Sequence, residues 1–344
     1  MTHTLLRSLG LAVVAGALAG PFAAAQPAPA YAVTDHIKIP DGGFDYASFD
    51  PAHRRVYVSR AGGVTAVDID SKTVTGHLIE AGRTHESLPL DDGAKLLVTD
   101  STSNSAHLVD ALTGARLAEI PVGQKPDGAL FDPASGLALV LNGASGTASL
   151  VDPAAQKAVG TIAIGGGLEF GVADGAGKAF VNVEDKNQIA VLDTQARKLV
   201  GHYALNGCEG PTGLAYAPDA GVLISACANK VAKVIRASDG ADLATLNIAA
   251  GADAVIYDAG RYLAFIPCGR DGVLVVIAVR SASDVAVVQT VKTQVGAKTG
   301  ALDPKTGALY LPTAHFAVGP GGAKGAPAPG SFELLVVAPA GGSM

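Results

Sequence analysis

Acidic residues recur at one position of an internal repeat in this 344-residue chain, where their carboxylates could act together. Only 31 residues of the whole chain are acidic, yet this position holds an acid in five of seven repeats. In order it reads Asp45, Glu86, Asp127, Glu169, Thr212, Asp253 and Lys298. Like charges around a narrow opening raise one another's pKa or attract a cation, and oxygen ligands from several strands suit Ca²⁺ or Mg²⁺. The column therefore predicts a candidate cation site at Asp45, Glu86, Asp127 and Glu169.

Three further residues belong with this candidate site. His85 offers a nitrogen ligand or a proton carrier beside the acids. Lys298 would complete the circle next to the first repeat and offset part of the negative charge. Glu184 would join Glu169 from a loop on the same face. The alternative interpretation is structural: the acids hydrogen-bond backbone amides of the neighbouring repeat, and the loop around Glu184 is a solvated turn.

These side chains are positioned by a unit of about 41–45 residues that occurs seven times. Each unit has a turn between two short apolar runs, and the turns begin at Asp50, Asp91, Asp132, Asp174, Ala217, Asp258 and Asp303. A fixed period of this length, with several short strands per unit, indicates a radially stacked repeat. We therefore predict an all-β fold, a seven-bladed β-propeller in which the acids line the mouth of a central channel.

The strand count within the repeats predicts how the ring closes. Residues 126–166 contain four short β-rich runs joined by tight turns, which indicates a four-stranded antiparallel blade. The last repeat, from residue 297, supplies only three strands, the third over 331–337. Residues 32–40 have the pattern of a fourth strand. We predict that this N-terminal strand completes the last blade, so that residues 32–338 form a single propeller domain.

The first 25 residues have the pattern of an export signal. One positive charge in residues 1–7 is followed by an apolar stretch over 9–19, and Ala23-Ala24-Ala25 precede Gln26. A membrane anchor is the alternative, but the apolar stretch is too short to span a bilayer. We predict a signal peptide over residues 1–25, cleavage after Ala25, a periplasmic or secreted protein, and no membrane span in the remainder.

Composition argues against several classes of function. The formal net charge is −6 and Lys and Arg do not cluster, which gives no electrostatic reason to bind nucleic acid. Trp is absent, which argues against a platform for stacking sugars. Gly and Pro are spread through the turns, but over Gly319–Gly330 they predict a flexible surface loop. We expect a monomer.

The run after each turn ends in a variant of Tyr-Val-Thr-Asn, as in Tyr57-Val58-Ser59-Arg60, Leu97-Val98-Thr99-Asp100 and Leu139-Val140-Leu141-Asn142. With segments such as Phe44-Asp45-Tyr46 and Pro126-Asp127, the chain resembles the YVTN-repeat, YncE-like family of seven-bladed β-propellers over residues 32–338. Several of the tetrads depart from the consensus, and only Asn142 keeps the final Asn. The resemblance implies the fold and not a function, because propellers host enzymes, binders and scaffolds alike.

The three cysteines allow one disulfide. Cys208 precedes the inner strand of the fifth repeat and Cys227 ends its antiparallel partner, so both fall at the same end, and export permits oxidation. The family resemblance also suggests this pair. A bond between Cys227 and Cys268 is the alternative, since the two occupy equivalent positions in adjacent repeats. We expect Cys268 to be a small buried residue.

Recognisable catalytic motifs are missing from the sequence. It contains no Cys-x-x-Cys-His haem motif, phosphate loop or Gly-x-Ser-x-Gly elbow. We therefore predict a non-enzymatic, exported binding or interaction protein whose partner is a protein or a small molecule. One alternative is a hydrolase of a small lactone or ester, in which a metal at the acidic column and His85 activates water. The other is an accessory protein of a periplasmic redox or metal-handling system, which compartment and fold analogy suggest.

Overall fold

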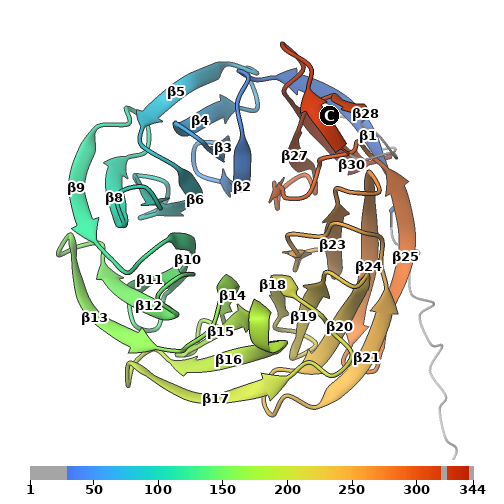
Figure 1. Cartoon of the computed structure of the whole chain (residues 1–344). Coiled ribbons are helices and arrows are strands. Elements are labelled where there is room, and N and C mark those ends of the chain that lie inside the picture. The colour runs from blue at the N-terminus through green and yellow to red at the C-terminus, as the bar shows by residue number, and fades with distance from the viewer. Residues whose placement is uncertain (1–28, 319–323, 341–344) are drawn as a thin grey trace, which may run out of the picture.

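A computed structural model of the chain describes residues 29–318 and 324–340. The strands form seven four-stranded antiparallel sheets around a common centre, which confirms the predicted seven-bladed β-propeller (Figure 1). In the described ranges the helical content is one short 3-10 turn, η1 (Glu184–Lys186), and no helix is long and apolar enough to cross a membrane. The predicted export signal lies outside the described residues.

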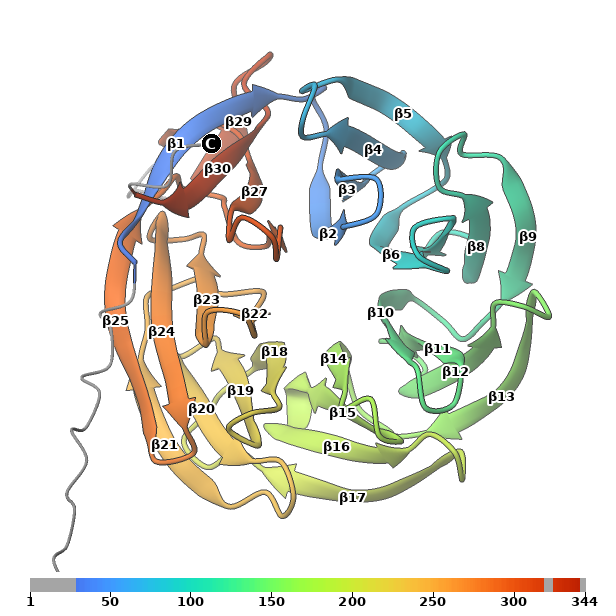
Figure 2. The ribbon, with the colours of Figure 1, turned by 180° about the vertical axis from the view of Figure 1, so that it is seen from behind.

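Six blades are each built from four consecutive strands, ordered from the centre to the rim (Figure 2). Blade 1 comprises β2 (Phe44–Asp50), β3 (Arg55–Arg60), β4 (Gly63–Asp68) and β5 (Val74–Glu80). Blade 2 comprises β6 (Thr84–Leu90), β7 (Lys95–Asp100), β8 (Ser105–Asp110) and β9 (Arg116–Pro121). Blade 3 comprises β10 (Pro126–Asp132), β11 (Leu137–Asn142), β12 (Thr147–Asp152) and β13 (Lys157–Ala163).

The next three blades follow the same order. Blade 4 comprises β14 (Leu168–Ala173), β15 (Lys178–Val183), β16 (Gln188–Asp193) and β17 (Lys198–Ala204). Blade 5 comprises β18 (Pro211–Ala217), β19 (Val222–Cys227), β20 (Val231–Arg236) and β21 (Asp242–Asn247). Blade 6 comprises β22 (Ile256–Asp258), β23 (Leu263–Cys268), β24 (Val273–Ser281) and β25 (Asp284–Lys292).

The seventh blade joins the two ends of the chain. Its order from the centre is β26 (Ala301–Leu302), β27 (Leu309–Thr313), β30 (Glu333–Pro339) and β1 (Tyr31–Lys38). β1 pairs antiparallel with β30, with Tyr31 opposite Pro339 and Lys38 opposite Glu333. The N-terminal strand therefore closes the ring as predicted, because it supplies the outermost strand that the C-terminal repeat lacks.

One prediction about the last blade was wrong in part. Residues 319–330 were expected to form a flexible surface loop, but β28 (Phe316–Val318) and β29 (Lys324–Pro327) pair as a small antiparallel hairpin. Phe316 lies opposite Pro327 in this hairpin. The Gly and Pro content of the segment predicted turns correctly but concealed a short strand, since backbone pairing does not require large side chains.

The apolar core lies between neighbouring blades. All six residues of β11 are buried, as expected for a strand covered on both faces. One cluster packs Val58 of blade 1 against Tyr310 of blade 7, and another packs Ile224 of blade 5 against Ile266 of blade 6. Full burial of each such aliphatic side chain contributes about 1.5–3 kcal/mol, which is how a chain without Trp holds its blades together.

Four aspartates of the repeated turns, Asp50, Asp132, Asp258 and Asp303, are buried. Asp50 is fully buried and accepts the N–H of Ala52 at 2.9 Å, while Asp132 accepts the hydroxyl of Thr194 at 2.6 Å. Gly93 of the following blade approaches Asp50 so closely that a Cβ would lie 2.4 Å from its Oδ1, at a φ of +80°. The recurring turn therefore ties adjacent blades together and leaves the opposite end of the inner strands for chemistry.

Cys208 and Cys227 form a disulfide with a Cα–Cα distance of 5.5 Å. This confirms the predicted pair over the alternative bond to Cys268. The thiol of Cys268 is free and buried, and burial raises its pKa to about 12. The raised pKa disfavours the thiolate, which is the reactive form of cysteine, and the burial agrees with the small buried residue that the sequence predicts.

Truncation of one core residue in the closing strand should destabilise the whole ring. Ile37 in β1 is 6% exposed and packs with Phe332 and Leu334. We expect Ile37→Ala to lower the free energy of unfolding in urea by about 2–5 kcal/mol. Val287→Ala, at a position 39% exposed on β25, is the matched control and should change it by less than about 0.5 kcal/mol. Equal losses would show that β1 is not packed into the last blade.

Candidate functional site

A β-bulge at the start of the inner strand shapes the mouth of the central channel. In the first five blades, two residues of this strand face one residue of its partner strand. The bulged pairs are Asp45-Tyr46, His85-Glu86, Asp127-Gly128, Glu169-Phe170 and Thr212-Gly213. Bulges interrupt the ladder and redirect side chains. Four members of the acidic column therefore lie in bulges, all at the same end of the propeller.

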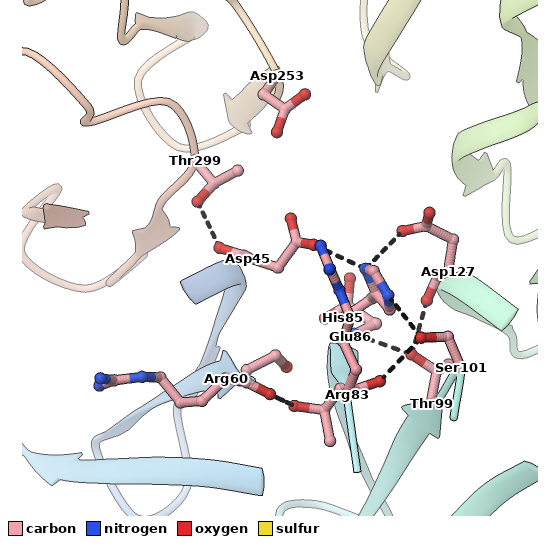
Figure 3. A network of polar contacts seen from close by, with 12 residues as sticks. Asp45, Arg60, Arg83, His85, Glu86, Thr99, Ser101, Asp127, Asp253 and Thr299 are labelled. Atoms are coloured by element: carbon pink, nitrogen blue, oxygen red, sulfur yellow. Dashed lines mark hydrogen bonds and ion pairs between the residues drawn. The ribbon is translucent and has the colours of Figure 1, made fainter. Parts of the chain in front are cut away.

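Asp45, His85 and Asp127 come from three successive blades and converge at this mouth (Figure 3). His85 Nδ1 lies 2.7 Å from Asp45 Oδ2 and 3.5 Å from Asp127 Oδ1. His85 is 4% exposed and Asp127 is 9% exposed. Burial raises the pKa of Asp127 above its usual value, an effect that the neighbouring His85 opposes.

The second ring nitrogen of His85 also has a partner. Nε2 lies 3.0 Å from Oγ of Ser101, the first residue after β7. Sequence analysis did not single out Ser101. The available signal was its position directly after a variant of the repeated tetrad, at the same end of the blade as the acids.

Lys298 lies on the other side of Asp45. Its Nζ forms an ion pair with Asp253 and lies 3.6 Å from Asp45 Oδ1. Burial acts to lower the pKa of Lys298, but the two carboxylates outweigh it and the pKa is raised. Burial likewise raises the pKa of Asp253, against the effect of Lys298. The ammonium group of Lys298 thus lies between Asp253 of blade 6 and Asp45 of blade 1, as the repeat alignment predicts.

Glu86 is not among the three residues whose donor atoms converge. Its side chain is buried, and its Oε1 accepts the N–H of the next residue, Ser87, at 2.9 Å. Burial, together with the nearby charges of Asp45 and Asp127, raises the pKa of Glu86 to about 8. This carboxyl group is therefore mainly protonated at neutral pH, which makes it a poor cation ligand.

Glu169 and Glu184 also lie apart from the cluster. Burial, then the charges of Asp127 and Glu184, raises the pKa of Glu169 to about 8. Glu184 is exposed at the start of η1. Of the four carboxylates predicted as a metal set, the structure brings together Asp45 and Asp127, and it adds His85 to them.

Two aromatic rings meet across the centre of the propeller. Tyr46 of blade 1 and Phe170 of blade 4 have ring centroids 5.2 Å apart in an edge-to-face arrangement. These blades stand on opposite sides of the ring (Figure 1). Burial, with the charges of the surrounding acids, raises the pKa of Tyr46 well above its usual value. The contact bridges the channel beside the acidic cluster and was not anticipated from the sequence.

A groove of about 460 Å³ opens beside Lys298. Its lining includes Phe44 and Phe332, together with Pro327 from the β28–β29 hairpin. The mouth therefore offers an apolar wall next to the ion pair of Lys298 and Asp253, so a ligand could combine a polar group with a small organic part.

The converging residues can hold a cation or move a proton. One ligand atom from each of Asp45, His85 and Asp127 lies within 4.8 Å of the other two. A divalent cation would replace the proton on Nδ1 that bonds to Asp45. One nitrogen and two oxygen donors suit Zn²⁺ or Mn²⁺ better than the all-oxygen preference of Ca²⁺ and Mg²⁺. Without a cation, the same ring links two carboxylates to the hydroxyl of Ser101.

Comparison with known proteins establishes the fold alone. No protein-family model and no curated protein sequence matches the chain. A chain of the mitotic checkpoint complex superimposes with a TM-score of 0.74 at 15% identity, covering 96% of this chain and 99% of that one. A chain of Kuenenia stuttgartiensis hydrazine synthase superimposes with a TM-score of 0.70 at 18% identity, covering 80% and 94%. Both are similar in architecture, and the YncE-like resemblance stays a prediction.

The buried Glu86 should make stability depend on pH. Its folded-state pKa is about 8 against an ordinary value of 4.5, so the folded protein keeps a proton that the unfolded chain releases. This contribution is complete below pH 4.5 and is lost as the pH rises through 8. We expect the melting temperature to fall over this range, and to fall less in Glu86→Gln. Each kcal/mol of lost unfolding free energy lowers the melting temperature of a large domain by about 2–4 °C.

Circular dichroism melts at a series of pH values measure this effect. Glu80→Gln, at an exposed position on β5, is the matched control and should keep the wild-type slope. Parallel curves for wild type and Glu86→Gln would show that the Glu86 carboxyl is not protonated in the fold.

Proposed function

We propose that this protein is an exported binding protein related to the YncE-like YVTN-repeat propellers, and that its channel mouth binds a divalent cation. Residues 1–25 act as the signal peptide and residues 32–338 as the binding domain. The Cys208–Cys227 disulfide supports an oxidising compartment. The propeller fold is compatible with a partner at its rim, which we propose to be a protein or a small molecule.

The convergence of Asp45, His85 and Asp127 carries this proposal. These residues lie far apart in the chain, and three bulges bring their donor atoms to one point. Two carboxylates beside an imidazole give a negative site with a neutral nitrogen donor once Nδ1 loses its proton, which is the form that metals bind. Ser101 would then accept the remaining N–H of His85 and orient the ring, as outer-sphere partners of histidine ligands do.

Zn²⁺ should stabilise the protein through His85. At a concentration about 100 times its dissociation constant, a ligand that binds only the folded state adds about 2.7 kcal/mol. We expect melting temperature to rise with Zn²⁺ or Mn²⁺, and to rise less with Ca²⁺ or Mg²⁺. His85→Ala should abolish the rise, whereas Glu169→Gln, outside the three-donor cluster, should preserve it. No shift with any of the four ions, or a full shift in His85→Ala, would contradict the proposed site.

A metal-assisted hydrolase is the second candidate, because three protein donors leave a coordination position open for water. Zn²⁺-loaded protein would then hydrolyse one member of a panel of small lactones and esters, and Asp127→Ala would lose both metal and turnover. Metal binding without turnover on the panel would favour the binding protein.

The export proposal predicts a processed N-terminus. When the full chain is expressed in a Gram-negative bacterium, we expect the mature protein to begin at Gln26 and to appear in the periplasmic or secreted fraction. Intact mass and N-terminal sequencing measure this. Protein that retains Met1 and remains in the cytoplasm would contradict the signal peptide.

A further inference from the structure

We propose that Ser101, His85 and Asp45 form a nucleophilic triad that hydrolyses small neutral or cationic esters without a metal ion. Asp45 Oδ2 lies 2.7 Å from His85 Nδ1, and His85 Nε2 lies 3.0 Å from Ser101 Oγ (Figure 3). A carboxylate, an imidazole and a hydroxyl in this order define a serine nucleophile by geometry and role, whatever the fold.

The hydrogen-bond chemistry gives the triad its direction. An ionised carboxylate only accepts, so Asp45 holds the proton of the neutral ring on Nδ1 of His85. Nε2 then carries the lone pair that faces the hydroxyl of Ser101 at 3.0 Å and can take its proton, and the carbonyl of Arg83, 3.3 Å from Oγ, is a second acceptor for this hydroxyl. Asp127 Oδ1, 3.5 Å from Nδ1, adds a second carboxylate beside the imidazolium that forms. The charge that develops on His85 therefore lies between two negative groups.

The loop that carries Ser101 is held in place. The buried carboxylate of Asp100 accepts the N–H groups of Gly82 at 2.9 Å, Arg83 at 3.1 Å and Thr102 at 2.9 Å. These bonds keep the pKa of Asp100 below its usual range despite its burial. A Cβ at Gly82 would lie 2.5 Å from Cβ of Thr102, so the two loops meet where only glycine fits. These contacts fix Ser101 relative to His85, which lies two residues after Arg83 in the chain.

The reaction balances with water as the only co-reactant. Ser101 Oγ attacks the ester carbonyl while its proton passes to His85 Nε2. The C–O bond to the alcohol breaks, the alcohol leaves with that proton, and an acyl group remains on Ser101. Water then attacks the acyl carbonyl and gives one proton to His85 Nε2. The bond between the acyl carbon and Ser101 Oγ breaks, His85 returns that proton to Oγ, and the carboxylic acid leaves. The N–H of Ser101 is already donated to the carbonyl of Arg83 at 2.9 Å, so we assign the oxyanion contact to the exposed guanidinium of Arg83, two residues before His85 in the chain.

The charge of the mouth selects the substrate class. Asp45 and Asp127 flank the ring of His85, whereas Asp253 is paired with Lys298. The two carboxylates beside the ring favour a neutral or cationic ester over an anionic one. The inference does not depend on cation binding. A cation at Nδ1 would displace the proton that Asp45 holds there, so a bound cation and an active triad exclude each other.

Covalent labelling with a fluorophosphonate probe in the presence of a chelator tests the triad. We expect full-length protein to gain one probe mass, which peptide mapping places on Ser101, and Ser101→Ala to gain none. His85→Ala should slow labelling by about 10²-fold or more. Ser283→Ala, at an exposed position between β24 and β25, is the matched control and should label at the wild-type rate.

Asp45 is a positioning residue, so its test uses a rate. We expect Asp45→Asn to slow labelling by about 10²–10⁴-fold per folded molecule, because the amide holds the wrong ring tautomer. Added Zn²⁺ should protect Ser101 if the cation site is also real. Labelling of Ser101 that Zn²⁺ does not slow would contradict the proposed cation site and support the triad. Folded wild-type protein that gains no probe at Ser101, or labels equally well after His85→Ala, would overturn the triad whatever the metal titration shows.

Discussion

The β-bulge at the start of the inner strands is the constraint on which the channel mouth depends. A regular strand alternates its side chains between two faces, so only every second residue could point toward the centre. In blade 1 the bulge directs Asp45 to the polar cluster and Tyr46 to Phe170 on the far side of the ring. In blade 2 it delivers His85 to that cluster and leaves Glu86 buried against the ladder. The same local irregularity, repeated around the ring, assembles a site that no single blade contains.

The mouth handles its excess of carboxylates in three ways, because burying an uncompensated charge is costly. Asp45 and Asp127 share the ring of His85. Asp253 pairs with Lys298, whose own charge is in turn stabilised. Glu86 and Glu169 form no ion pair with another described residue, and burial raises the pKa of each to about 8, so both retain protons to higher pH. Neighbouring positions of one column therefore have different chemistry, set by partners in adjacent blades.

The sequence allowed the fold to be predicted in some detail, and the site only in outline. The seven-fold period and the missing fourth strand predicted the propeller and the pairing of β1 with β30. The acid column predicted the mouth but not which acids meet, because side-chain direction at a bulge is set by backbone geometry that periodicity does not encode. The contact of His85 with Ser101 went unnoticed for the same reason, since it depends on the bulge in β6. The Tyr46–Phe170 contact joins blades on opposite sides of the ring, which a repeat alignment does not place together.

The aromatic bridge between Tyr46 and Phe170 gives the two faces of the disc unequal roles. Because the two rings lie across the channel beside the polar cluster, a small molecule would reach and leave the cluster from the mouth alone. A partner bound over the mouth would therefore control whether the cluster is occupied. The opposite face, where buried turn aspartates link neighbouring blades, could be attached to a surface without blocking the polar cluster.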